Sequence, residues 1–144
     1  MIRGAFVTIR GRRRPYIAAN ITFPTLGRSL DVAMLVDTGA DRTVLSPVVA
    51  ARLGINLAAL ARGQPGSGVG GQMQTRMIDA VVNLDAHSIP LTLAILEARP
   101  GQPPPLIPSL LGRDILSRFA LFLEERTDRV LLLEPHEAGA LVFP

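Results

Sequence analysis

The chain has 144 residues, of which 48% are hydrophobic and 19% charged. This balance excludes a disordered chain and predicts one globular domain. No apolar run approaches the about 20 residues of a membrane helix, and the first residues lack the apolar segment of a signal peptide. We therefore expect a cytoplasmic protein with no membrane association.

Some chemistries are excluded by residues that the chain lacks. There is no cysteine, so disulfides, thiolate metal ligands and cysteine nucleophiles are all excluded. The two histidines, His87 and His136, lie far apart in the sequence and have no ligand spacing. We expect neither a metal nor a cofactor.

All 15 basic residues are arginine, so the isoelectric point is near 10.9 although the formal net charge is only +3. A basic cluster occurs at Arg10, Arg12, Arg13 and Arg14. Such a cluster can contact phosphates, but it is also typical of a solvated turn between strands. With one tyrosine and no tryptophan, platforms for stacking bases are scarce. We favour the turn, and binding of nucleic acid is the weaker alternative.

The first third of the chain is predicted to form strands. Residues 5–9 and 16–23 read as a hairpin, and the second of these strands alternates well enough to bury one face. A third strand, 30–36, ends at Asp37, and a short strand follows at 43–45.

A short helix is predicted next. Ser46 suits the N-cap and Pro47 the first helical position. The helix should continue through Leu53 and end at Gly54.

The middle of the chain contains a glycine-dense stretch, residues 62–71, between strand-like segments. We expect it to be the tip of a long hairpin, with strands at 72–84 and 89–96. A phosphate-binding loop is the competing interpretation, but neither Lys-Ser/Thr nor a helix start follows the glycines.

The last third begins with a stiff surface loop at 99–108, which holds five prolines. An apolar strand then ends at Gly112, and a short helix is expected to bury Ile115, Leu116 and Phe119. A final hairpin pairs two strands at 120–124 and 129–133. The tail after Leu133 is expected to be either a further strand or a loose end.

The most informative stretch is Leu35-Val36-Asp37-Thr38-Gly39-Ala40. An apolar strand here delivers a carboxylate into a turn, where Gly39 permits close backbone approach and Ala40 leaves room beside Asp37. An ordinary turn explains the tripeptide Asp-Thr-Gly equally well, because Asp and Gly favour turns. The tripeptide alone does not decide between a turn and an active site.

Two further stretches add to this one. Leu110-Leu111-Gly112-Arg113-Asp114-Ile115-Leu116 follows in the chain, and Gly68-Val69-Gly70-Gly71 lies between. In this order, over residues 30–134, the sequence resembles the retropepsin-type aspartic proteases. The resemblance implies a mostly all-β fold, a half-barrel with a glycine-rich flap hairpin and one or two short helices.

The resemblance also implies roles for individual residues. Asp37 would be the catalytic carboxylate, Thr38 would stiffen the floor of the site across a two-fold axis, and the Gly39 backbone would contact substrate. Asp41 and Arg113 would form a buried ion pair, with two unrelated surface charges as the alternative. The remaining implied site residues are Ala40 in the active-site loop, Gly112 as structural support, and Gly68, Val69, Gly70 and Gly71 in the flap.

Catalysis of this type needs two carboxylates that share one proton. The chain has a single Asp-Thr-Gly, so the second aspartate must come from a second chain. We therefore expect a homodimeric endopeptidase that acts on peptides or proteins. A catalytically silent dimer that binds peptides is the alternative, and which terminal strands join the two chains stays open. Candidates for the groove wall are Leu35, Val69, Met73, Leu106 and Ile107.

Overall fold

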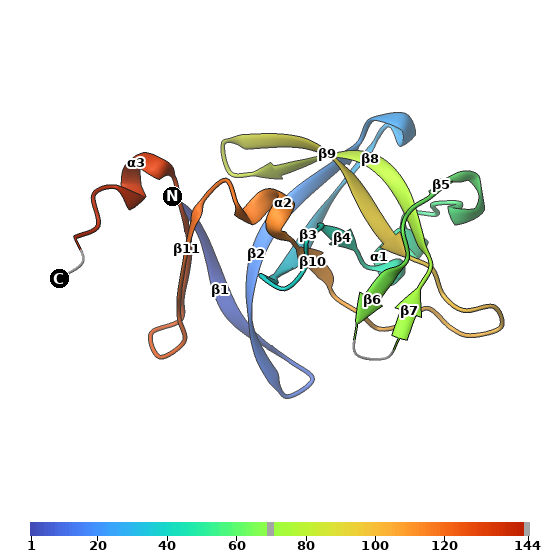
Figure 1. Ribbon diagram of the computed structural model, residues 1–144, viewed down its shortest axis with the longest axis horizontal. Helices are drawn as coiled ribbons and strands as arrows, with labels where there is room; N and C mark the ends of the chain where they lie inside the picture. The colour runs from blue at the N-terminus through green and yellow to red at the C-terminus, as the bar shows by residue number, and fades with distance from the viewer. Residues whose placement is uncertain (69–70, 143–144) are drawn as a thin grey trace.

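The computed structural model describes residues 1–68 and 71–142 (Figure 1). Strands dominate this part of the chain, which confirms the prediction of a mostly β fold. The strands are β1 (Ile2–Ile9), β2 (Arg12–Phe23), β3 (Arg28–Val36), β4 (Val44–Leu45), β5 (Ala61–Arg62), β6 (Gly66–Gly68), β7 (Gly71–Met73), β8 (Thr75–Leu84), β9 (His87–Leu96), β10 (Ser109–Leu111), β11 (Ala120–Glu124) and β12 (Arg129–Leu133). The helices are η1 (Pro24–Leu26), α1 (Pro47–Arg52), η2 (Leu57–Ala59), α2 (Arg113–Leu116) and α3 (Pro135–Ala138).

Within the described residues, ten strands form one sheet in the order β11-β12-β1-β2-β3-β10-β4-β9-β8-β5. An additional pairing of β2 with β8 curls this sheet back on itself. The strands β6 and β7 form a separate two-stranded sheet. In Figure 1 this pair projects from the end of the molecule opposite to α3 and the N-terminus.

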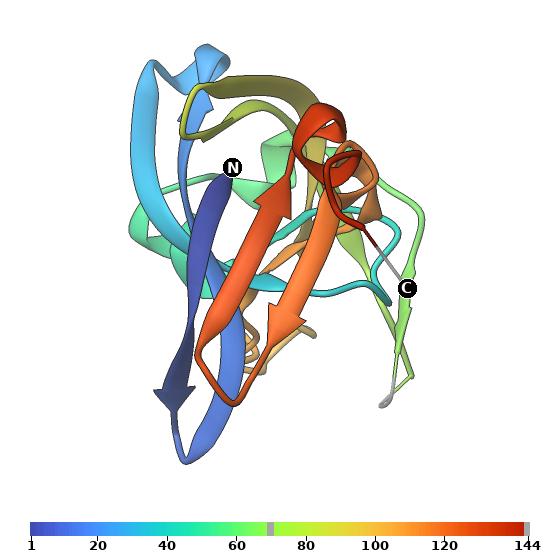
Figure 2. The ribbon, with the colours of Figure 1, turned by 90° about the vertical axis from the view of Figure 1, so that its left-hand side faces the viewer.

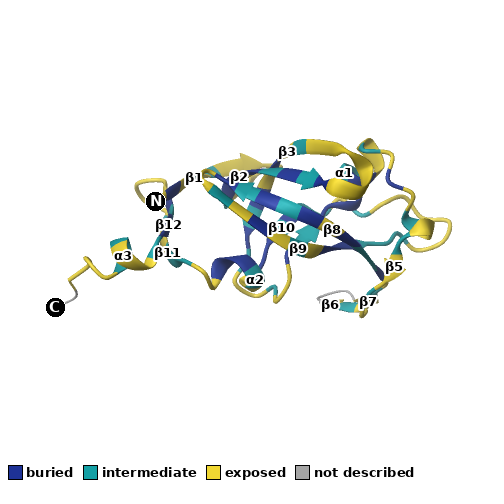
Figure 3. Ribbon diagram, turned by 90° about the horizontal axis from the view of Figure 1, so that it is seen from above, coloured by how far each residue is buried: buried dark blue, intermediate teal, exposed yellow. Residues whose placement is uncertain are grey.

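The core lies inside the curled sheet. Alternate residues of β2 face inward, and Ile17, Ile21 and Phe23 are fully buried. Figure 3 shows buried segments along β2 and β8, whereas α3 and the connecting loops are mostly exposed. This is the period-2 pattern that the sequence of β2 predicts.

The strand β1 changes its partner at Gly4. Residues Ile2 to Gly4 pair with β12, and Ala5 to Ile9 pair with β2. A Cβ atom on Gly4 would lie 2.3 Å from the carbonyl oxygen of Tyr16, so only glycine fits where the strands cross. Figure 2 shows the resulting sheet of β1, β12 and β11.

The expectation that the arginine cluster lies in a turn is wrong for three of its four members. The turn consists of Arg10 and Gly11 alone, both at positive φ, and Arg12 to Arg14 belong to β2. A two-residue turn of this kind suits a tight hairpin, so the following arginines pair with β1. The Arg13 guanidinium lies over the Phe6 ring and pairs with Asp128.

The short helices follow their capping residues. The Ser46 hydroxyl accepts a hydrogen bond from the Val48 N–H at 3.3 Å, as expected for an N-cap of α1. The helix α2 is shorter than predicted, because it ends at Leu116 and leaves Phe119 outside.

The tail after Leu133 is neither of the two forms expected from the sequence. It begins with the helix α3, in which the Glu137 carboxylate accepts a hydrogen bond from the Glu134 N–H at 2.8 Å. Glu137 also lies 2.9 Å from the terminal amine of Met1, so α3 and the N-terminus are held together. No helix in the described part of the chain is long and apolar enough to cross a membrane.

Packing of β2 should dominate stability. Ile21 has no exposed surface, so Ile21→Ala should lower the free energy of unfolding by about 2–5 kcal/mol and Ile21→Val by about 0.5–1.5 kcal/mol. Denaturant titration of both variants measures this, with Ile9→Val on the exposed end of β1 as the control. Equal, small losses for all three variants would contradict this position of the core.

Candidate active site

The candidate site is built around the Asp37 loop, which we define as residues 37–43. The strand β3 leads into this loop, and its last two residues, Leu35 and Val36, pair in parallel with Leu110 and Leu111 of β10. The Asp37 N–H continues this ladder by donating to the Leu111 carbonyl oxygen at 3.1 Å. The position of Asp37 is therefore fixed by two central strands.

Inside the loop, one main-chain N–H holds the Asp37 carboxylate and another holds the Asp37 main chain. Its Oδ1 accepts a hydrogen bond from the Gly39 N–H at 2.9 Å, and the Ala40 N–H donates to the Asp37 carbonyl oxygen at 3.2 Å. Oδ2 accepts no hydrogen bond from the described residues. A Cβ atom on Gly39 would lie 3.2 Å from Oδ1, so a side chain there would press on the carboxylate. Asp37 itself is half-buried.

A buried hydrogen-bond network, the Thr43 clamp, fastens the far end of the loop to α2. We define the clamp as Thr43, Gly112 and Asp114. The Thr43 hydroxyl donates to Asp114 Oδ1 at 2.6 Å and accepts from the Gly112 N–H at 3.1 Å, while the Thr43 N–H donates to Asp114 Oδ2 at 2.9 Å. Thr43 has no exposed surface. Each buried polar atom of this threonine therefore has a partner.

Sequence reasoning missed the role of Thr43 and Asp114. Asp114 lies in the quoted Gly-Arg-Asp motif, but its partner is 71 residues away and no local pattern connects the two. The motif itself was the one available indication.

Close backbone contact between the Asp37 loop and the start of α2 explains why residue 112 is glycine. A Cβ atom there would lie 2.4 Å from the carbonyl carbon of Arg42 and 2.8 Å from the Thr43 nitrogen. The next two residues also form hydrogen bonds to the loop. The Arg113 N–H donates to the Ala40 carbonyl oxygen at 2.8 Å, and the Asp114 N–H donates to the Asp41 carbonyl oxygen at 3.2 Å. The Asp37 loop and the start of α2 thus form one hydrogen-bonded unit.

Asp41 and Arg113 approach each other, but the expectation of a buried ion pair is wrong. Arg113 Nη1 lies 3.4 Å from Asp41 Oδ1, and the two side chains are 65% and 89% exposed, respectively. Their main chains join the loop to α2, since the Arg113 N–H donates to the Ala40 carbonyl oxygen and the Asp41 carbonyl oxygen accepts from the Asp114 N–H, while both side chains lie at the surface. An ion pair this exposed contributes about 0–1 kcal/mol.

Beside the loop lies an open cleft of about 800 Å³. Ala40 and Arg42 form one border, and the loop after β9 supplies Arg99 and Ile107. The apolar lining residues are Ala40, Val44, Pro65, Met73, Met77, Ala94, Leu96, Pro103, Pro105, Ile107 and Leu110.

Of the five residues predicted to form the groove wall, two line the cleft, two do not, and one is not described. Met73 and Ile107 line the cleft, as expected. Leu35 and Leu106 do not, because Leu35 is paired within the sheet and the Leu106 side chain is 66% exposed outside the cleft. Val69 lies outside the described residues.

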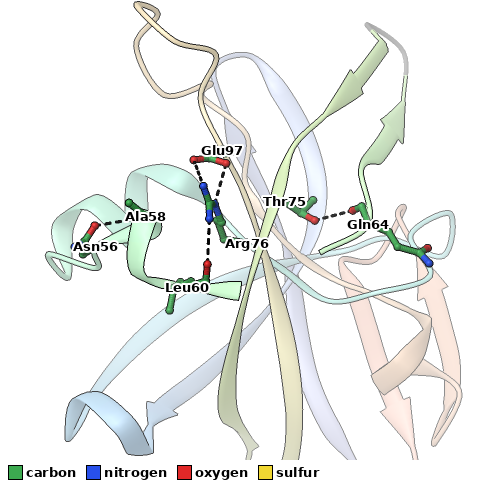
Figure 4. Close-up of polar contacts among 7 residues, drawn as sticks. All are labelled: Asn56, Ala58, Leu60, Gln64, Thr75, Arg76 and Glu97. Carbon is green, nitrogen blue, oxygen red and sulfur yellow. Dashed lines mark hydrogen bonds and ion pairs between the residues drawn. The ribbon is translucent and has the colours of Figure 1, made fainter. Parts of the chain in front are cut away.

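The strands β6 and β7 border the cleft on another side and pair antiparallel, with Gly66 opposite Met73 and Gly68 opposite Gly71. Of the predicted flap tip, Val69 and Gly70 lie outside the described residues. The base of this strand pair is fixed by Thr75, whose hydroxyl donates to the Gln64 carbonyl oxygen at 2.6 Å (Figure 4).

A second polar cluster lies at the start of β8. The Arg76 guanidinium donates to both carboxylate oxygens of Glu97, at 3.0 and 3.1 Å, and to the Leu60 carbonyl oxygen at 3.1 Å (Figure 4). The Arg76 side chain is only 12% exposed. Its hydrogen bonds hold the pKa of the Glu97 carboxyl below its ordinary value of 4.5. This pair joins β8, the end of β9 and the segment before β5.

Both histidines of the chain contact the same carboxylate, which their sequence separation did not reveal. His87 Nε2 lies 3.2 Å and His136 Nδ1 3.6 Å from the Glu134 side chain. The described residues contain no group of three or more side chains arranged to hold a metal ion. The histidines instead connect the β8–β9 hairpin to α3.

Known structures share this architecture. The EIAV protease, solved in complex with an inhibitor, matches with 25% identity and a TM-score of 0.55 over 77% of this chain and 92% of its own. A retropepsin-like aspartic protease from Rickettsia conorii matches with 22% identity and a TM-score of 0.62 over 90% and 87% of the two chains. The fold is therefore retropepsin-like, as predicted.

The sequence supports the same class. The family model described as aspartyl protease matches residues 25–115, which is more than half of the chain and includes both the Asp37 loop and the start of α2. The chain belongs to the aspartyl protease family. A comparison with curated protein sequences gives no significant match.

The Thr43 clamp can be tested by removing one hydroxyl. Thr43→Val keeps the shape but leaves Asp114 Oδ1 and the Gly112 N–H without their partner, so the free energy of unfolding should fall by about 1–3 kcal/mol. Thr43→Ser keeps the hydroxyl and should recover most of this loss. Denaturant unfolding measures both variants, and equal stability of the two would contradict the clamp.

The Arg76–Glu97 pair predicts a pH-dependent contribution to stability. The pKa of Glu97 is lowered on folding, so its contribution is complete above pH 4.5 and is lost as the pH falls through the folded pKa. At pH 7, the free energy of unfolding of Glu97→Gln should therefore be about 1–2 kcal/mol lower than that of the unmodified chain. This difference in the free energy of unfolding should disappear as the pH is lowered.

Urea titrations at several pH values check this prediction. Glu125→Gln is the matched control, because Glu125 is 66% exposed in its contact with Arg13. A gap that stays constant down to strongly acidic pH would show that the charge of Glu97 is not responsible.

Proposed function

We propose that the protein is an aspartic endopeptidase that works as a symmetric homodimer, with Asp37 of each chain in a shared catalytic pair. The observation that carries this proposal is the Asp37 loop, in which two β-strands and α2 hold one carboxylate at a fixed position. Membership of the aspartyl protease family supports it. The intact Asp-Thr-Gly favours an enzyme over a silent peptide-binding dimer.

The position of Asp37 relative to the cleft agrees with a site that two chains complete. The cleft is lined by Gly39, Ala40 and Asp41 but not by Asp37, which lies at its border. A second chain related by a two-fold axis near Asp37 would bring a second carboxylate beside the first and a second cleft beyond it. An extended peptide would then run from one cleft to the other.

The reaction would use both carboxylates and one water. Two carboxylates at about 3 Å cannot both be ionised, so the pair holds a single proton. The ionised Asp37 takes a proton from the water, which attacks the scissile carbonyl carbon, while the protonated Asp37 donates to the carbonyl oxygen. The Asp37 that took the proton of the water then gives it to the amide nitrogen, and the C–N bond breaks as the other Asp37 takes a proton from one hydroxyl of the tetrahedral intermediate. This releases an amine and a carboxylic acid and leaves one proton on the pair. The Gly39 N–H keeps the carboxylate orientation through its bond to Oδ1.

Other parts of the loop would serve the same reaction. The exposed Thr38 hydroxyl is available to bond across the two-fold axis, and the Gly39 and Ala40 main chain borders the space for substrate. Gly112 and Arg113 support the loop through their main-chain contacts to Arg42 and Ala40, and Asp41 does so through its carbonyl oxygen, which accepts from the Asp114 N–H.

The strands β6 and β7 would form a flap over the bound peptide. The proposed flap residues are Gly68, Val69, Gly70 and Gly71, of which Gly68 and Gly71 pair with each other in the described structure, and the flanking residues line the cleft. An extended peptide can pair its backbone with such strand edges, and closure of a small-residue tip would exclude water from the reaction.

Substitution of the carboxylate is the direct test. Asp37→Asn removes the charge with little change of shape and should lower kcat for peptide hydrolysis by at least about 10³-fold. Sedimentation should still detect a folded dimer. Asp85→Asn, in the exposed β8–β9 turn, is the matched control and should keep full activity.

Two outcomes would refute this mechanism. One is full activity of Asp37→Asn, which would mean that another group performs the reaction. The other is undiminished specific activity in a species that sediments strictly as a monomer, because one chain offers a single Asp-Thr-Gly.

A further inference from the structure

We propose that the cleft selects peptides in which an acidic side chain lies close to an apolar one, with Arg42 and Arg99 binding the acidic group. This inference rests on the proposed function, because it concerns the substrate of the same site. It begins from the charges that line the cleft.

Among the lining residues in the described part of the chain, three are charged: Asp41, Arg42 and Arg99. The negative charge of Asp41 is shared with Arg113, which lies outside the lining. Arg42 and Arg99 have no ion pair and no side-chain hydrogen bond with the residues that the structure describes. The cleft therefore offers two arginines whose charge is not neutralised by the chain.

These two arginines come from different borders of the cleft. Arg42 belongs to the Asp37 loop, and its main chain is fixed against Gly112. Arg99 lies in the loop after β9, and its Nη2 would be 4.0 Å from a Cβ atom on Gly71 of β7. One guanidinium thus extends from a rigid segment and the other lies beside the proposed flap.

The acidic residue closest to Arg99 in the sequence already has a partner. Glu97, two residues earlier, uses both carboxylate oxygens to bind Arg76. Elsewhere on the surface, exposed arginines such as Arg13, Arg126 and Arg129 have acidic neighbours within 4 Å. Other exposed arginines, such as Arg52 and Arg118, also have no ion pair within the described residues, but only Arg42 and Arg99 among the arginines line the cleft where a peptide would bind.

The remaining lining defines the second half of the preference. Met73, Met77, Leu96 and Ile107 offer an apolar surface, and the flexible methionine side chains adapt to different shapes. A carboxylate brought beside this surface is partly removed from water, which strengthens its paired hydrogen bonds to a guanidinium. A lysine or arginine of the peptide would meet like charge in the same place.

Peptide binding to the Asp37→Asn dimer tests this preference without a need for turnover. The probes are three blocked fluorescent octapeptides with a central Leu-Phe pair, which differ only in having Glu, Gln or Lys at the two positions on each side. We expect the Glu peptide to bind about two- to fivefold more tightly than the Gln peptide for each arginine engaged, and the Lys peptide to bind most weakly. The preference should shrink with added salt.

Variants of the arginines then assign the effect. In Asp37→Asn chains, Arg42→Gln and Arg99→Gln should each reduce the ratio of Glu to Gln affinity, and Arg42→Glu combined with Arg99→Glu should reverse the preference toward Lys. Arg52→Gln, on the exposed end of α1 and away from the cleft, is the matched control and should leave the ratio unchanged.

Equal binding of the three peptides, or a preference that survives in the Arg42→Gln, Arg99→Gln double variant, would overturn this inference. So would failure of all three peptides to bind. The proposed function is judged separately, by cleavage of the Gln peptide by the unmodified chain. A charge preference in binding without any cleavage would contradict the enzyme and leave the specificity of the cleft supported.

Discussion

The arrangement of the candidate site depends above all on one buried hydroxyl. The Thr43 hydroxyl lies between the Asp114 carboxylate and the Gly112 N–H, and without it Asp114 Oδ1 and the Gly112 N–H would each lose their partner. Removing water from a carboxylate is costly unless hydrogen bonds replace it. The contact therefore holds only when the Asp37 loop and α2 adopt their native arrangement together, and it links two segments that the sequence separates by 71 residues.

This arrangement separates rigid from adaptable parts of the cleft. The Asp37 loop is bounded by β3, β10 and the clamp, so its carboxylate has little freedom. The strands β6 and β7 form their own small sheet and contact the rest through their base, near Thr75. A site that binds an extended chain benefits from both properties, because a fixed reacting group needs precise placement and the cover must open to admit the substrate.

Much of the fold could be predicted from local patterns. A few neighbouring residues were enough to predict three elements, and the structure confirms them. These are the alternation in β2, the Ser46-Pro47 start of α1 and the final hairpin. The exposure of the Asp41 and Arg113 side chains could not be predicted, because exposure depends on tertiary contacts that no local pattern encodes. The same reason hid the Thr43 clamp, the pairing of Arg76 with Glu97, and the meeting of His87 and His136 at Glu134.

The pairing of β3 with β10 also orders events during synthesis of the chain. The Asp37 N–H finds its partner at Leu111, and the loop completes its hydrogen bonds only with Gly112 to Asp114. Contacts between segments so distant in sequence form late, because a long loop must close first. The chain must therefore have left the ribosome as far as Asp114 before Asp37 can reach its final environment. A nascent chain that is still shorter than this carries the aspartate without the framework that holds it.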